Sequence, residues 1–109
     1  MMMPSILLAA AVAGATPATP AHPCAAEART QALKLLRFHN DGDNRATIDP
    51  ASLRKIGTVA SLVGKRRFDV LEIWGSVYKG EYRMRLIYAN PAGMCVLMGQ
   101  EILEHSDPY

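Results

Sequence analysis

The sequence predicts an α+β domain, in which an N-terminal helix packs on a three- to four-stranded antiparallel meander after a cleaved signal peptide. Three observations predict this fold class. An apolar run near the N-terminus is followed by small residues, apolar residues then recur at helical spacing, and the last third alternates apolar and polar residues between turn signals. We therefore expect residues 1–21 to be a signal peptide and residues 22–109 to form one small domain closed by a disulfide.

The apolar run Ile6–Ala15 has the length of a signal-peptide core and falls short of the roughly 20 residues that span a bilayer. Small residues at 13–15 and 19–21 provide two cleavage sequences, although no Lys or Arg precedes the run. A buried N-terminal helix is the alternative, but Pro17 and Pro20 would break it. The sequence therefore predicts export to the bacterial periplasm or outside the cell, with no membrane anchor.

Cys24 and Cys95 are the only cysteines of the chain. In an oxidising compartment an isolated pair predicts a single disulfide, which here would enclose nearly the whole domain. A metal site or a catalytic thiol would need nearby partners, and the sequence has no Cys-x-x-Cys motif and no His cluster. We expect a structural disulfide, no metal and no cofactor.

The segment from Cys24 to about His39 has the pattern of an amphipathic helix that begins after Pro23. Its apolar stripe consists of Ala25, Ala28, Ala32, Leu35, Leu36 and His39. The polar residues 40–44, with Gly42 among them, should end the helix because Gly and Asn tolerate the left-handed conformation. His39 is expected to be a partly buried structural residue.

Residues 45–67 give the weakest pattern. A short extended piece is expected at Thr47–Pro50, followed by a turn. Leu53–Val63 fits either a strand or a short helix, and its β-branched residues favour a strand. Residues 64–67 should then form a polar turn.

The final third predicts a β-meander. The first strand should cover Phe68–Tyr78, with a bulge or bend at Gly75, and Lys79-Gly80 should make a two-residue hairpin turn. Two further strands are expected at 82–88 and 94–103, joined by a turn at 90–93. The aromatic residues and methionines of these strands are expected mostly in or beside the core, and the last residues should form a tail. These side chains are Trp74, Tyr78, Tyr82, Met84, Tyr88, Met94 and Met98.

Arg83, Arg85 and Ile87 alternate with the apolar residues of their strand and should share its outer face. An apolar side chain there is exposed unless a partner covers it, so these three residues are a candidate partner surface if Val77 or another apolar residue joins Ile87 on this face. The arginines could also join Lys65–Arg67 in a basic patch that binds an acidic envelope component or an acidic partner protein, although a solvated turn and sheet face is the simpler interpretation.

No local motif predicts catalysis. A calcium loop starting at Asp41 would place Arg45 at a ligand position, and the strand carboxylates Asp69 and Glu72 should lie on opposite faces. A net charge of +2 is too small to indicate nucleic acid binding. We expect a non-enzymatic binding module of the bacterial envelope, whose partner is another envelope protein or a small ligand. A small secreted enzyme with a site assembled from distant residues is the alternative.

Overall fold

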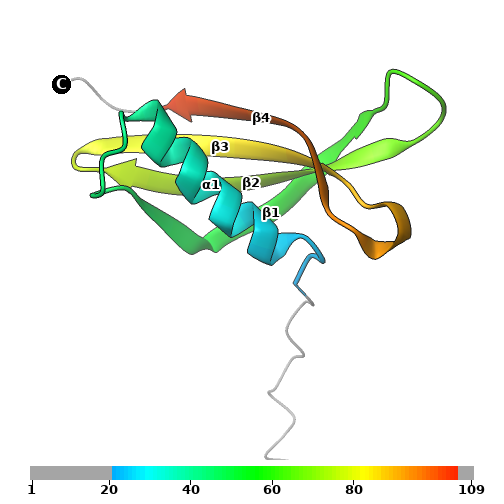
Figure 1. The fold of residues 1–109 in the computed structure, drawn as a ribbon, viewed down its shortest axis with the longest axis horizontal. Helices are drawn as coiled ribbons and strands as arrows, with labels where there is room; N and C mark the ends of the chain where they lie inside the picture. The colour runs from blue at the N-terminus through cyan, green and yellow to red at the C-terminus, as the bar shows by residue number, and fades with distance from the viewer. Residues whose placement is uncertain (1–20, 106–109) are drawn as a thin grey trace, which may run out of the picture.

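A computed structural model describes residues 21–105, so the predicted signal peptide and the last four residues lie outside the described part of the chain. The fold class is confirmed, with one helix packed against a four-stranded antiparallel sheet (Figure 1). In chain order the elements are α1 (Ala25–His39), β1 (Thr47–Ala60), β2 (Arg67–Val77), β3 (Gly80–Ala89), the short 3-10 turn η2 (Pro91–Gly93) and β4 (Val96–Glu104).

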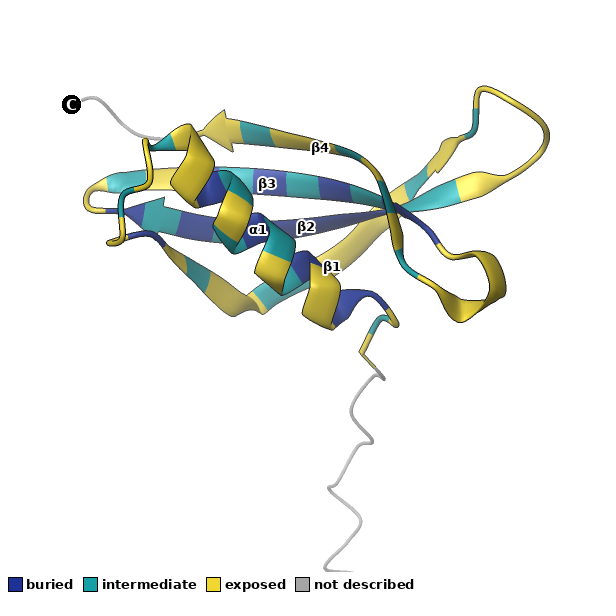
Figure 2. Ribbon diagram, in the orientation of Figure 1, coloured by how far each residue is buried: buried dark blue, intermediate teal, exposed yellow. Residues whose placement is uncertain are grey.

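The sheet is a simple meander, because its spatial order β1-β2-β3-β4 is also its order in sequence. Helix α1 covers one face of this sheet, and the core lies between the two layers (Figures 1 and 2). Among residues 21–105 no helix or strand covers the other face, which we call the open face.

Helix α1 packs closely on the sheet because its inward stripe is built from small residues. Ala28 and Ala32 are fully buried, and Leu36 in the same stripe is the one large side chain that is also fully buried. Beneath the helix, alternate residues of β2 and β3 complete the core: Leu71, Ile73, Val77, Tyr82, Met84, Leu86 and Tyr88. The predicted helical stripe is thus confirmed except at its last residue, His39, which is exposed and makes a T-shaped ring contact with Tyr82.

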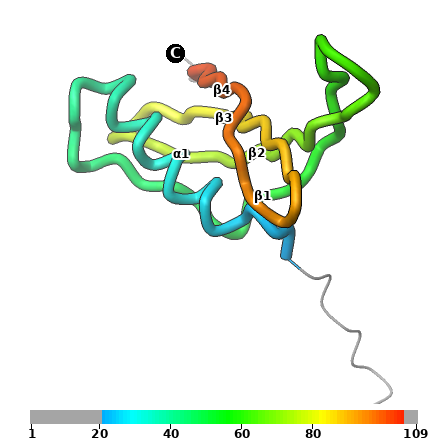
Figure 3. Tube along the Cα trace, turned by 45° about the vertical axis from the view of Figure 1, so that its right-hand side comes forward, coloured from blue at the N-terminus to red at the C-terminus, as the bar shows by residue number. Residues whose placement is uncertain are grey.

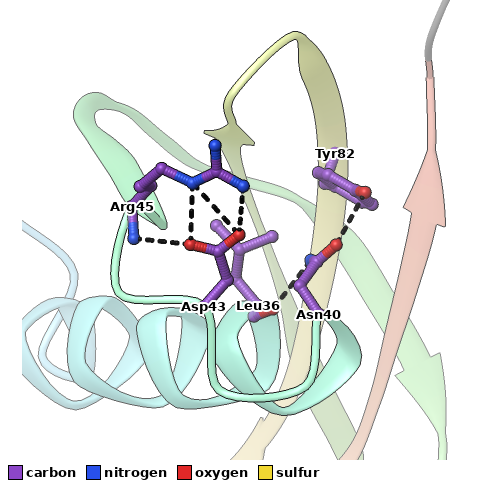
Figure 4. A network of polar contacts seen from close by, with 5 residues as sticks. All are labelled: Leu36, Asn40, Asp43, Arg45 and Tyr82. Atoms are coloured by element: carbon purple, nitrogen blue, oxygen red, sulfur yellow. Dashed lines mark hydrogen bonds and ion pairs between the residues drawn. The ribbon is translucent and has the colours of Figure 1, made fainter.

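The end of α1 is fixed to the sheet by the side chain of Asn40 (Figure 4). This amide donates to the carbonyl of Leu36 at 2.9 Å and accepts from the hydroxyl of Tyr82 at 3.0 Å. Gly42, with a φ of 78°, donates its N–H to the carbonyl of Arg37 at 2.7 Å, which closes the left-handed helix end that the sequence predicts.

Strand β1 is longer than expected, since the predicted short piece and the following strand form one edge strand of 14 residues. Its pairing with β2 is interrupted between Asp49 and Arg54, where Pro50 lacks an N–H for the ladder. The hydroxyl of Ser52 accepts the N–H of Trp74 at 2.9 Å in that gap. The strand also ends earlier than predicted, at Ala60.

Gly75 does not form the predicted bulge, because it pairs in regular register with Ile48 on one side and Tyr82 on the other. A Cβ at this position would lie 2.8 Å from the carbonyl oxygen of Thr47 and 2.9 Å from Cδ2 of Leu36. The position therefore needs glycine for close packing of α1 on the sheet rather than for a bend.

The β2–β3 turn is also shifted by one residue from the prediction. Val77 pairs with Gly80, so the two turn residues are Tyr78 and Lys79. Tyr78 adopts the left-handed conformation with a φ of 55°, and the guanidinium of Arg45 lies 5.1 Å from its ring centroid.

This shift removes Tyr78 from the core, and its side chain is exposed. Met94 and Met98 are likewise exposed, whereas Tyr82, Met84 and Tyr88 are buried as expected. Met94 precedes β4, which begins only at Val96. The prediction that most of these residues belong to the core is therefore wrong for the turn and the last strand.

Candidate partner-binding face

The side chains of the open face lie in rows across the strands, and the order of these rows follows from the strand register. A charged row crosses all four strands and consists of Arg54, Glu72, Arg85 and Glu101. On one side of it lies the row that contains Trp74, Arg83 and Leu103. On the other side lie two apolar rows, one with Val70 and Ile87 and one with Val59 and Phe68.

At the centre of the charged row, the carboxylate of Glu72 is buried although its sheet face is open. The residue is only 3% exposed, because arginines from both neighbouring strands lie over it. Arg85 donates to it at 3.1 Å and Arg54 at 3.3 Å, while Nε of Arg83 lies 4.0 Å away. Two of the three predicted surface residues, Arg83 and Arg85, are thus engaged with this carboxylate.

The pKa of Glu72 is set by two opposing effects. Burial acts to raise it, but the hydrogen bonds from Arg85 and Arg54 lower it by more, so the pKa of the carboxyl lies below its ordinary value of 4.5. The folded state therefore binds this proton less readily than the unfolded state. Its contribution to stability is present above the unfolded pKa and is lost as the pH falls through the folded pKa.

We expect the substitution Glu72→Gln to lower the free energy of unfolding at neutral pH by about 2 kcal/mol, because it leaves the clustered guanidinium groups of Arg54, Arg83 and Arg85 without the buried carboxylate that neutralises them. The matched control is Glu101→Gln, in the same row but with a side chain 58% exposed, which should change stability by less than about 0.5 kcal/mol. Urea unfolding at pH 7 and pH 4 measures both effects. The loss of unfolding free energy caused by Glu72→Gln should be smaller at pH 4 than at pH 7. An equal loss at both pH values would contradict the lowered pKa of the Glu72 carboxyl.

Ile87, the third predicted surface residue, lies in an apolar group of the open face. It pairs directly with Val70, which is buried, and Ile56 and Val59 of β1 line the same hollow with both side chains 38% exposed. This hollow has a volume of about 330 Å³, and Arg85 and Glu101 form its charged side. Val77 does not contribute to it, because it is buried on the helix-covered face.

The predicted basic patch is divided in the structure. Arg83 and Arg85 lie over Glu72 in the middle of the sheet, whereas Lys65 and Arg66 belong to the loop at the end of the β1–β2 hairpin. Arg67, the first residue of β2, donates to the hydroxyl of Thr58 at 2.7 Å. The two groups of cations therefore do not form one surface.

The expected disulfide between Cys24 and Cys95 is present. It joins the residue before α1 to the residue before β4, and Cys24 is fully buried. The side-chain amide of Asn90 donates to the sulfur of Cys24 at 3.6 Å. A structural disulfide of this kind is compatible with an oxidising compartment.

Beside the disulfide, His22 and Asp69 form the one described pair that resembles part of a catalytic site. Nε2 of His22 lies 2.7 Å from the Asp69 carboxylate, and this hydrogen bond lowers the pKa of Asp69. The other ring nitrogen, Nδ1, accepts the backbone N–H of Cys24 at 3.0 Å. Because both ring nitrogens are engaged, the pair holds the chain in front of α1 and has no nitrogen left for a substrate.

Asp69 and Glu72 lie on opposite faces of β2, as the sequence predicts, since Asp69 binds His22 on the helix side. Within residues 21–105, no group of three or more His, Cys, Asp or Glu side chains is arranged to hold a metal ion. In the same part of the chain, no helix is long and apolar enough to cross a membrane.

Sequence reasoning identified Ile87 on the open face but missed Val70 and the burial of Glu72. A signal for both was available in β2, where Phe68, Val70 and Trp74 alternate with the core residues Leu71 and Ile73. A strand with apolar residues on both sides indicates that both of its faces are shielded from water. Glu72 interrupts this apolar pattern, which indicates that its carboxylate is paired with cationic side chains.

The chain matches no protein-family model, and no curated protein or solved structure matches it either. The assignment of the open face as a candidate site therefore depends on the contacts of the described residues.

Proposed function

We propose that this protein is a non-enzymatic binding module of the bacterial envelope, and that it captures another envelope protein on the open face of its sheet. The observation that carries the proposal is the hollow of about 330 Å³ lined by Ile56, Val59, Val70 and Ile87. It lies on the sheet face opposite α1, so it is separate from the core that stabilises the fold.

The chemistry of this hollow favours a protein segment over a small ligand. Its apolar side offers two partly exposed β1 side chains to an apolar side chain of a partner. Arg85 and Glu101 at its edge provide one cation and one carboxylate, 3.7 Å apart, which can bind a partner's charged or amide groups. An apolar centre bordered by polar groups of both signs is typical of protein interfaces.

Glu72 supports the same proposal because it keeps the arginines in place. Arg85 donates to Glu72 through Nε at 3.1 Å and approaches Glu101 through Nη1. Arg54 is held to the same carboxylate from the opposite strand, with its side chain 71% exposed. Such fixed guanidinium groups lose little conformational entropy when a partner binds.

The proposed location is the periplasm or the outside of the cell. It is supported by the Cys24–Cys95 disulfide together with the signal-peptide pattern of the sequence. Among the described residues, no observation favours the enzyme alternative over binding, since His22 is engaged at both ring nitrogens.

The substitution Ile87→Asp tests the proposal. It places a charge in the hollow and should abolish partner capture, while costing no more than about 1 kcal/mol of stability because Ile87 is only half-buried. Wild type and variant are immobilised and compared as bait for envelope proteins of the producing cell, with quantitative mass spectrometry as the readout. Circular dichroism verifies that both are folded.

Phe38→Asp is the matched control, because Phe38 is 85% exposed on α1, away from the open face. We expect one or a few proteins to be enriched by wild type and by Phe38→Asp, and lost with Ile87→Asp. Equal enrichment by all three baits would refute the open face as the binding surface. A collapsed fold in Ile87→Asp would instead show that Ile87 is a core residue.

A further inference from the structure

The β1–β2 hairpin extends past helix α1 and ends in a loop that stands apart from the core (Figures 1 and 3). We call residues 61–67 the hairpin tip. Leu62 and Val63, which were expected in a strand, lie in this loop and are 103% and 81% exposed. Two adjacent aliphatic side chains are thus exposed to solvent in this loop. Figure 2 shows the end of the hairpin in the colour of exposed residues.

The tip is closed by its own hydrogen bonds, so the exposure of Leu62 and Val63 is built into the loop. The N–H of Ser61 donates to the carbonyl of Arg66 at 2.8 Å, and the Ser61 hydroxyl accepts the N–H of Val63 at 3.1 Å. Gly64 adopts a φ of 76°, which completes the reversal.

The cations of the tip follow directly after its apolar pair. Lys65, Arg66 and Arg67 are all exposed, and residues 61–67 contain no carboxylate. Arg66 and Arg67 also line a hollow of about 500 Å³ shared with Pro91 and Ala92, so the β3–β4 loop lies beside the tip at the same end of the sheet. This end of the molecule therefore combines protruding apolar side chains with an uncompensated positive charge.

We propose that the hairpin tip docks on an anionic phospholipid bilayer, with Leu62 and Val63 inserted between headgroups and Lys65 and Arg66 against lipid phosphates. The surface of an anionic bilayer offers an environment for each part of the tip. Its acyl chains receive apolar side chains, and the negatively charged headgroups above them attract cations. An acidic protein would satisfy the cations, but it would need an apolar pocket of its own for the two aliphatic side chains, whereas an anionic bilayer supplies both environments. The contact is peripheral and reversible, and it is independent of the open face.

Sedimentation with vesicles tests this proposal, using protein purified from an oxidising compartment. The vesicles consist of phosphatidylcholine alone or of phosphatidylcholine mixed with phosphatidylglycerol. We expect the protein to bind the anionic vesicles and to remain in solution with the neutral ones. Lys65→Gln/Arg66→Gln should lower the partition coefficient about thirtyfold, and Leu62→Ser/Val63→Ser about tenfold or more at unchanged charge.

The matched control is Lys34→Gln/Arg37→Gln, which removes the same charge from exposed positions of α1 and should have little effect. Insertion itself is measured by fluorescence of Leu62→Trp in a Trp74→Phe background, where anionic vesicles should shift the emission to the blue. Phe38→Trp in that background should show no shift, because Phe38 is likewise exposed to solvent but lies on α1, outside the hairpin tip.

Three results would overturn the proposal. The first is the absence of vesicle binding, and the second is an equal loss from the α1 control pair, which would indicate unspecific attraction. The third is full retention of binding by Leu62→Ser/Val63→Ser without a fluorescence shift, which would point to an acidic soluble partner of the cations.

Discussion

Removal of the disulfide is expected to lower the free energy of unfolding by about 4 kcal/mol. Cys24 and Cys95 are separated by 71 residues, so the bridge restricts most of the unfolded domain. A domain of this size has little core to compensate for such a loss. We expect the melting temperature to fall on the order of 15–30 °C in Cys24→Ser/Cys95→Ser.

Thermal unfolding followed by circular dichroism, with and without a reductant, measures this effect. Wild type should lose stability when reduced, whereas Cys24→Ser/Cys95→Ser should melt at the same low temperature in both conditions. A wild-type protein that melts equally with and without reductant, after complete reduction is verified by mass, would contradict a stabilising role for the bridge.

Gly75→Ala is expected to lower the free energy of unfolding by about 3 kcal/mol. The added Cβ would lie 2.8 Å from the carbonyl oxygen of Thr47 and 2.9 Å from Cδ2 of Leu36. The first neighbour is backbone of the paired strand, and the second belongs to the fully buried leucine of α1. Relief of the clash must therefore shift β1 or lift the helix from the sheet.

Gly57→Ala is the matched control, because a Cβ there has nothing within 4 Å and the position is exposed on β1. Its effect should be neutral or slightly stabilising, since alanine restricts the unfolded chain. Urea unfolding of both variants gives the comparison. Similar free energies of unfolding for the two variants would show that α1 does not need the close approach at Gly75.

The helix and the strands of the last third could be predicted because their signals are local. The spacing of Ala28, Ala32 and Leu36 indicates one helical face, and the alternation around Met84 indicates a half-buried strand. The disulfide could be predicted from composition, because only two cysteines are present. These features depend on residues close in sequence or on a simple count.

The features that the sequence did not predict depend on tertiary packing. Gly75 has the same local signal whether it forms a bulge or lies under a helix, and only the position of Leu36 distinguishes the two. The turn shifted to Tyr78 because the pairing of Val77 with Gly80 continues the register of the whole hairpin. Local preference for glycine at positive φ was outweighed by that register.

For the candidate site, the sequence identified which residues share a face but not what covers them. Alternation alone predicts that Arg83, Arg85 and Ile87 share one face. The burial of Glu72 beneath arginines of two neighbouring strands requires the order β1-β2-β3, which alternation does not supply. Local patterns also do not reveal that Leu62 and Val63, whose sequence pattern favours a strand, lie in an exposed loop.

Photo-crosslinking in the producing cell tests whether the open face binds a protein. A photoreactive amino acid replaces Ile56, which lines the hollow and is 38% exposed, and in a parallel strain it replaces the exposed Lys34 of α1. If the open face binds a protein, we expect a discrete protein adduct from position 56 that disappears when Ile87→Asp is added, and no matching adduct from position 34. The same adducts from both positions, or an adduct from position 56 that persists in Ile87→Asp, would contradict binding at the open face.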